Sequence, residues 1–401
     1  MTIQQPTLNP QPIKKIALFE LGFRPFFLFA SLFSVIATVI WMASFTFGWS
    51  LPVSKITPIA WHGHEMIFGY AVAVIGGFLL TAVRNWTGVA TIKGPALAAL
   101  VLSWILARTL PLLNSGLLFE WAALFDLAFL LGLILAIAHP IVKVKQWRQL
   151  MIVAILVSIL AADIVYYLGV LHIVNQGVSW GLFSAVYLIM ALIFTLARRV
   201  MPFFIERGVG YQVQLKNWSL IDSTSLVFLA ALLIVDVFLK QALLTALISF
   251  VLVLLHATRL YGWYTKGIWQ KPLLWVLFLA YSLFIVGFAL KAINFFSLYP
   301  TSLPLHAFTY GGIGMMTLGM MARISLGHTG RNINEPPKIV TWIFLSLFLG
   351  TLIRVILPIF VPTAYLHIIG LAQGLWILAF SLFLVSYLMI FIRPRVDGQP
   401  G

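Results

Sequence analysis

The residues most capable of chemistry lie in the segment Trp61-His62-Gly63-His64-Glu65-Met66. Neutral imidazole is a good ligand for haem iron and for copper, and a neighbouring carboxylate can transfer protons. The chain has only eight histidines and is 9% charged, so this polar segment beside a long apolar stretch indicates a functional site. We take His62 and His64 as candidate metal ligands and Glu65 as a candidate catalytic proton donor. Glu65 also has a structural explanation, since a carboxylate in the first turn of a helix stabilises the helix dipole.

The composition predicts the kind of scaffold that holds these residues. The chain has 401 residues, is 62% hydrophobic and has a mean hydropathy of +1.05. A water-soluble domain cannot bury that much apolar surface, so the sequence predicts an all-α, polytopic integral membrane protein. The net charge of +15 is explained by basic loops that contact anionic lipid, and it does not indicate nucleic acid binding. The absence of cysteine excludes disulfides, iron–sulfur clusters and thiolate-bound haem.

About 20 apolar residues are needed for a helix to cross the hydrocarbon core of a bilayer. Twelve segments meet this requirement, so we expect about twelve transmembrane helices in one domain, residues 19-392. A polar tail, residues 1-18, precedes this domain and a short tail, residues 393-401, follows it. The predicted spans are 24–48, 64–84, 94–113, 117–138, 147–170, 179–197, 217–237, 240–259, 272–292, 304–323, 338–358 and 362–391.

Basic residues predict the orientation of these spans. Of the 25 lysines and arginines, 20 fall in the tails, in loops or at helix ends on the side of the N-terminus. Because cytoplasmic loops of membrane proteins are enriched in lysine and arginine, both termini are predicted to be cytoplasmic. The five on the opposite side are Lys55, Arg108, Lys240, Lys291 and Arg354.

This topology divides the candidate histidines into two clusters. His62, His64 and His306 fall at outer helix ends, whereas His256 and His328 fall at inner ends. His306 and His328 are separated by about 33 Å of helix, so they cannot bind the same metal. Residues two apart on a helix point about 200° apart. His62 and His64 can therefore share a metal only if the second helix begins near His64 and leaves His62 in the preceding turn.

Three further features bear on function. Arg323 and Arg331 lie near His328, where guanidinium groups could pair with haem propionates or simply mark a cytoplasmic loop. Asp126 lies inside the fourth span, where an ionisable group often lies on a proton or ion pathway. Aligning His64 with His306 also aligns Gly69 with Gly311 and Gly77 with Gly319, which suggests an internal repeat.

Several longer segments resemble the NnrS family, nearly from end to end of the chain. The matching segments are Leu21-Gly22-Phe23-Arg24-Pro25-Phe26-Phe27, Trp61-His62-Gly63-His64-Glu65-Met66, Gly77-Phe78-Leu79-Leu80-Thr81-Ala82, Asn85-Trp86-Thr87-Gly88, Arg199-Val200-Met201-Pro202-Phe203-Phe204, Pro272-Leu273-Leu274-Trp275 and Leu326-Gly327-His328-Thr329-Gly330-Arg331. The resemblance implies a twelve-helix protein of the bacterial inner membrane that contains haem b and copper. It also implies a link to denitrification and to protection against nitric oxide stress.

The resemblance extends to single residues, with one departure. His62, His64, His256, His306 and His328 stand where the family pattern has histidine. The family often has a further histidine three residues after the tryptophan of its Pro-Leu-Leu-Trp segment, and here Phe278 occupies that position. If that histidine is a ligand, the inner site of this chain lacks it; otherwise Phe278 is a packing residue.

The leading functional hypothesis is therefore a haem- and copper-containing membrane protein that binds and reduces or otherwise detoxifies nitric oxide. A small apolar diatomic molecule dissolves in the bilayer and can reach a buried haem. The sequence identifies no electron donor. Two other classes remain open: a secondary transporter of a metal or haem-related solute, and a haem sensor that binds nitric oxide without turnover.

Overall fold

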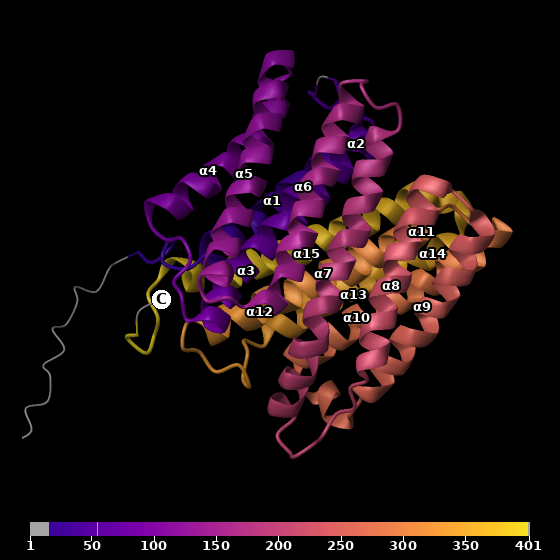
Figure 1. Ribbon diagram of the computed structural model, residues 1–401. Coiled ribbons are helices and arrows are strands. Elements are labelled where there is room, and N and C mark those ends of the chain that lie inside the picture. Colours follow the sequence, from indigo (N-terminus) through magenta and orange to yellow (C-terminus); the bar gives the residue numbers. More distant parts are fainter. Residues whose placement is uncertain (1–15, 54, 400–401) are drawn as a thin grey trace, which may run out of the picture.

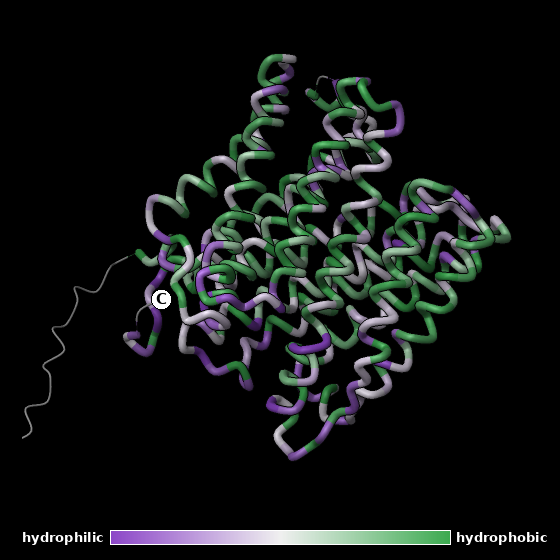
Figure 2. The backbone as a smooth tube through the Cα atoms, in the orientation of Figure 1, coloured by the Kyte–Doolittle hydropathy of each residue, from purple (hydrophilic) through white to green (hydrophobic). Residues whose placement is uncertain are grey.

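The computed structural model describes residues 16–53 and 55–399, and these residues form helices and loops without any strand. Eleven helices among them are long and apolar enough to cross a membrane. Figure 2 shows hydrophobic residues along the helices and hydrophilic residues gathered near their ends. The prediction of an all-α polytopic membrane protein is confirmed. Most of the predicted N-terminal tail, residues 1–15, lies outside the described residues.

The helices pack alongside one another as one bundle (Figure 1). Lipid offers no hydrogen bonds, so the backbone of each span satisfies its own polar groups by forming a helix. The main elements are α1 (Phe23–Phe45), α2 (Pro58–His64), α3 (Val72–Thr87), α4 (Pro95–Thr109), α5 (Gly116–Lys143), α6 (Leu150–Val170), α7 (Gly177–Gly208), α8 (Ser219–Leu233), α9 (Ala242–Gly262), α10 (Pro272–Ile293), α11 (Ser302–His306), α12 (Met315–Gly327), α13 (Ile339–Val355) and α15 (Tyr365–Ile392).

Two of the spans contain a π-helix directly after a histidine. The π-helix η1 (Glu65–Ala71) joins α2 to α3, and η7 (Ala307–Gly314) joins α11 to α12. The run Ser302–Gly327 is thus one continuous helical segment at the place of the tenth predicted span. It is not among the eleven apolar helices, so the total of twelve spans stays a prediction. The π-helix is uncommon and is frequently found at functional sites.

The second span begins earlier than the sequence predicted. Thr57 caps α2 by accepting a hydrogen bond from the Ala60 backbone N–H at 3.2 Å, and Pro58 occupies the first helical position. His62 therefore lies inside a helix rather than in a turn before it. The arrangement in which His62 and His64 share a metal is wrong, because the two side chains leave the helix in different directions.

The bundle is built from three units of four helical segments each, residues 23–143, 147–262 and 272–392. The second segment of each unit is followed by a glycine with positive φ, at Gly88, Gly210 and Gly330. The last helix of each unit packs against the first helix of the next: α5 on α6, α9 on α10, and α15 on α1. The second segments also contact one another at the centre, through α3 with α12, η1 with α7, and α7 with η7. This arrangement supports the repeat suggested by the alignment of His64 with His306.

Candidate functional site

A cavity of about 400 Å³ lies among the central segments of the bundle. Its wall is mostly aliphatic and aromatic, and the polar side chains that reach it include His62, His306, Arg354 and Gln373. Pockets of about 300–1,000 Å³ with apolar walls and a few converging polar groups are the usual form of small-molecule and cofactor sites. The cavity brings together two of the three predicted outer histidines.

Packing and hydrogen bonding orient the two imidazoles of the cavity. The His62 ring stacks on the Trp41 indole at a centroid distance of 4.4 Å, and its buried Nδ1 has no hydrogen-bond partner among the described residues. His306 Nδ1 lies 2.7 Å from the Ser302 carbonyl oxygen, to which it can donate. With the proton on Nδ1, the lone pair of His306 Nε2 is available to a ligand or a donor.

A guanidinium group completes the polar wall of the cavity. Arg354 Nη2 lies 3.2 Å from Nδ1 and 3.3 Å from Nε2 of His306, so the two side chains are in contact. Arg354 Nη1 is buried without a hydrogen-bond partner among the described residues. The wall therefore holds two imidazoles and an unsatisfied cationic donor, which suit a ligand that carries both a metal and an anionic group.

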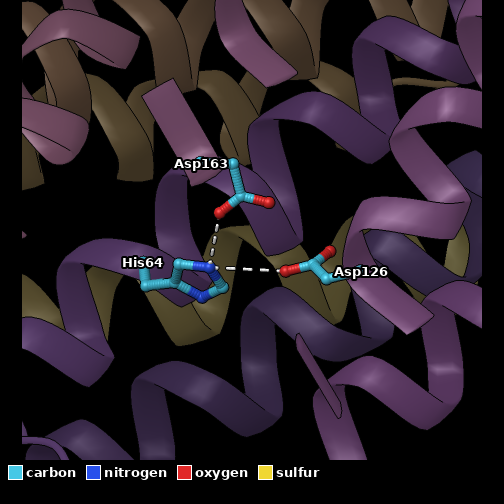
Figure 3. Close-up of side chains that lie close together, drawn as sticks. All are labelled: His64, Asp126 and Asp163. Carbon is cyan, nitrogen blue, oxygen red and sulfur yellow. Dashed lines mark hydrogen bonds and ion pairs between the residues drawn. The ribbon is translucent and has the colours of Figure 1, made fainter. Parts of the chain in front are cut away.

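His64 faces away from this cavity and enters a separate cluster of charged residues. Its Nε2 lies 3.1 Å from Asp163 Oδ1 and 3.3 Å from Asp126 Oδ2, and its Nδ1 lies 3.1 Å from Glu65 Oε1. Figure 3 shows both aspartates approaching this one nitrogen of the imidazole. His64, Asp126 and Asp163 come from α2, α5 and α6, and His64 and Asp163 are 99 residues apart in the sequence.

Other side chains surround this charged cluster, which comprises His64, Glu65, Arg108, Asp126 and Asp163. Arg108 forms ion pairs with Glu65 Oε2, at 3.3 Å, and with Asp126 Oδ2. Tyr167 donates a hydrogen bond of 3.0 Å to Asp126 Oδ2, and Tyr166 stacks on His64 at 4.4 Å. All five members are at most 3% exposed. Three carboxylates thus share one guanidinium and one imidazole in a buried site.

The structure corrects the explanation of Glu65 as a helix-start residue. The helix begins at Pro58, so Glu65 follows the second turn rather than occupying the first. Its carboxylate contacts Arg108 and His64, in the charged cluster, and does not line the cavity. The sequence pattern did not identify Arg108 or Asp163 as partners of His64. The only sequence signal was the presence of ionisable residues inside apolar spans.

The structure does not bring the two inner histidines together. His256 is fully buried, and its Nδ1 lies 2.6 Å from the Tyr281 hydroxyl, which also accepts a hydrogen bond from Arg259. His328 is half-buried after α12, with its ring 6.0 Å from that of Phe23. Among the described contacts the two imidazoles share no neighbour.

The remaining predicted residues have separate environments. Arg323 lies over the Phe204 ring at 3.9 Å, in a cation–π contact, and Arg331 is half-buried in the loop after His328. Phe278 is buried and packs against Trp269, with ring centroids 5.9 Å apart. Asp126, whose place inside a span suggested a proton pathway, pairs with Arg108 and contacts His64, and the pathway stays a prediction. The ligand roles of His256 and His328 stay predictions.

Comparison with known proteins agrees with the resemblance. The sequence model of the family described as NnrS protein matches residues 17–395, nearly the whole chain. A search of curated proteins found no match.

Proposed function

The chain belongs to the NnrS family, and we propose that it is a haem- and copper-containing protein of the bacterial inner membrane that binds nitric oxide. Family membership supports a membrane protein with a nitric oxide-related function. The finer proposal rests on the cavity, because this is where two half-buried histidines and a buried arginine converge. Reduction or other detoxification of the bound molecule is the reaction that we propose.

We assign the haem to the cavity, with His62 and His306 as candidate iron ligands. His62 Nδ1 and Arg354 Nη1 are buried without partners among the described residues, so the wall contains polar atoms that a bound group would satisfy. Arginine pairs bidentately with carboxylates, which suits Arg354 to a propionate. The aromatic residues Trp41 and Trp376, which line the cavity, would pack against a flat macrocycle.

The protein residues would then control binding rather than supply the redox chemistry. A bound haem supplies an iron that can bind a diatomic molecule. The apolar wall excludes water and admits a small apolar gas from the bilayer, while Trp41 fixes the plane of the His62 ring. Met66 also lines the cavity, and because copper prefers imidazole and thioether donors, we assign the copper to the same wall.

The test is to purify full-length protein with His62→Ala or His306→Ala and to measure haem and copper. We expect each variant to lose the Soret band or the copper, because a metal ligand has been removed. His367→Ala is the matched control, since His367 is exposed on α15, and it should retain both. Unchanged spectra and metal content in His62→Ala and His306→Ala would exclude these ligands.

The three repeated units favour a second candidate, a secondary transporter of a metal or haem-related solute, because many transporters are built from internal repeats. A folded, colourless and metal-free preparation would support that candidate over ours. Nitric oxide binding without turnover in the presence of an electron donor would support a non-catalytic haem sensor.

A further inference from the structure

We propose that His64, Asp126 and Asp163 form a binding site for one divalent transition-metal ion, separate from the cavity. One nitrogen and two carboxylate oxygens from these residues all lie within 4.8 Å of one another. The two distances from His64 Nε2 to the carboxylate oxygens are 3.1 and 3.3 Å. Ligands bound at about 2.1 Å with tetrahedral or octahedral angles lie about 3.0–3.4 Å apart. The three side chains therefore already have the spacing of ligands around one ion (Figure 3).

The partner of the other imidazole nitrogen supports this assignment. His64 Nδ1 lies 3.1 Å from Glu65 Oε1, and Arg108 holds the second oxygen of that carboxylate at 3.3 Å. Histidines that bind metals usually donate their other ring N–H to a carboxylate, a backbone carbonyl or water, which fixes the tautomer and leaves the opposite nitrogen free for the metal. Glu65 is thus a positioning residue for His64 in this proposal.

Two unsatisfied oxygens indicate that the cluster is built for a further partner. Asp126 Oδ1 and Asp163 Oδ2 are buried without a hydrogen bond among the described residues, and both aspartates are 0% exposed. These are the second oxygens of the two carboxylates whose first oxygens face His64 Nε2. An unsatisfied carboxylate oxygen is costly to bury, and a divalent cation bound by both oxygens of each carboxylate would remove that cost.

The charges of the cluster suit a divalent ion when His64 is neutral, as a metal ligand must be. Glu65, Asp126 and Asp163 carry three negative charges when ionised, and Arg108 carries one positive charge. With a neutral His64 the cluster has a net charge of −2, which one divalent cation neutralises. Burial of an uncompensated charge in a membrane protein is strongly unfavourable.

The donor set selects the class of metal. One imidazole and two carboxylates suit ions such as Mn²⁺, Fe²⁺ or Zn²⁺, whereas Cu⁺ prefers thiolate and thioether ligands. None of the residues that supply the three donors lines the cavity. The inference therefore does not rest on the proposed function, and the two can be tested separately.

The experiment uses the full chain, purified without a polyhistidine tag, treated with a chelator and titrated with Co²⁺ as the probe. We expect one Co²⁺ per chain with visible d–d absorption. Asp163→Asn should weaken binding by about tenfold or more, and Glu65→Gln should weaken it by about 10–100-fold, as loss of an orienting carboxylate does elsewhere. Asp236→Asn is the control, because Asp236 pairs with Lys291 outside the cluster and should not affect Co²⁺ binding.

Asp126→Asn would leave Arg108 without its closest partner and could prevent folding. The test therefore uses Asp163→Asn. Gel filtration verifies the fold of each variant. His62→Ala should retain the Co²⁺ site even when it loses haem, which separates this proposal from the proposed function. Absence of Co²⁺ binding in the wild type, or equal binding in wild type and Asp163→Asn, would overturn the proposal and leave a protonated network in its place.

Discussion

At the scale of single residues, Gly69 permits the close packing of the charged cluster. A Cβ at this position would lie 2.9 Å from Arg108 Nη1, from Glu65 Oε2 and from Phe33 Cε1. We predict that Gly69→Ala displaces the Arg108–Glu65 pair and destabilises the fold by about 1–3 kcal/mol, the usual cost of overpacking. The measurements are the thermal unfolding temperature in detergent and the affinity for Co²⁺, and both should be lower than in the wild type.

The control for this substitution is Gly374→Ala in α15, because no atom lies within 4 Å of the position of its added Cβ. That variant should be as stable as the wild type or slightly more stable, since alanine favours a helix over glycine by about 0.5–1 kcal/mol. Equal unfolding temperatures and equal Co²⁺ affinities in Gly69→Ala and Gly374→Ala would mean that the charged cluster tolerates a shift of the Arg108–Glu65 pair.

A second residue, Arg354, tests the position of the haem. We predict that Arg354→Gln lowers haem affinity by about tenfold, because a charged hydrogen bond to a buried carboxylate contributes about 1.5–3 kcal/mol. Arg323→Gln is the matched variant, since Arg323 stacks on Phe204 and does not line the cavity. Haem titration of the two apoproteins decides between the outer and the inner site. If only Arg323→Gln lowered the haem affinity, the haem would lie near the inner histidines.

At the scale of elements, hydrophobic runs in the sequence predict where helices lie but not which side chains meet. The predicted spans 24–48 and 362–391 correspond closely to the helices Phe23–Phe45 and Pro362–Ile392. The start of the second span was missed, because the capping by Thr57 and Pro58 lies outside the apolar run. The His64–Asp163 contact joins α2 to α6, and no local pattern specifies which helices become neighbours.

The helices α6 and α7 approach each other closely, and this packing depends on glycine. A Cβ at Gly181 would lie 2.6 Å from the Ala162 carbonyl oxygen and 2.8 Å from the Tyr166 backbone nitrogen. Because backbone atoms cannot rotate away, we predict that Gly181→Ala separates the helices and destabilises the protein by at least about 1–3 kcal/mol. It should also weaken Co²⁺ binding, since Asp163 and Tyr166 lie on α6. Thermal unfolding measures the loss of stability and Co²⁺ titration measures the loss of affinity, with Gly374→Ala again as the control.

The segment after α15 docks on the loop that contains His328. Arg395 Nη1 donates to the His328 carbonyl at 3.0 Å, and the Val396 N–H donates to the Thr329 carbonyl at 3.2 Å. Hydrogen bonds from Arg395 lower the pKa of the Asp397 carboxyl to about 2. Because this carboxyl pKa is lowered, the stability that Asp397 adds to the docked segment is fully present above the usual pKa of about 4. That stability is lost as the pH falls through about 2.

We therefore predict that Asp397→Asn loosens this segment at neutral pH, because Arg395 loses the partner that fixes its orientation. Faster amide hydrogen exchange in residues 393–398 would show the effect, with haem content as a control for the rest of the fold. The wild-type segment should remain docked at pH 5. Equal exchange rates in the wild type and the variant would mean that the backbone hydrogen bonds hold the segment without the ion pair.

At the scale of the whole molecule, the three units close into a ring through α15 and α1. Arg24 is buried and donates from Nη1 to the carbonyls of Ile390 and Phe391, both at 3.0 Å, and of Arg393 at 2.7 Å. Ile390 and Phe391 lie in the last turn of α15, where backbone carbonyls have no partner within the helix. The motif around Arg24 that suggested the family thus has a structural explanation: it joins the first unit to the last.

The same repeat predicts that Ser302–Gly327 crosses the membrane, because it occupies the place in the third unit that α2–α3 and α7 occupy in the other two. Its helix is less apolar since it contains His306 and several glycines, and those residues contact the cavity or neighbouring helices rather than lipid. If this run spans the membrane, the number of spans is even and both termini lie on one side, the cytoplasmic side according to the basic residues.

The absence of cysteine makes this prediction simple to test, since single cysteines can be introduced without removing any. Thr301→Cys and Asn334→Cys lie at exposed positions that flank Ser302–Gly327. A membrane-impermeant maleimide applied to intact bacteria with a permeable outer membrane should label Thr301→Cys, whereas Asn334→Cys should react only after lysis. The cysteine-free wild type is the control for background labelling. Labelling of both variants from the same side would mean that this helix does not cross, and would remove the basis for twelve spans and for termini on the same side.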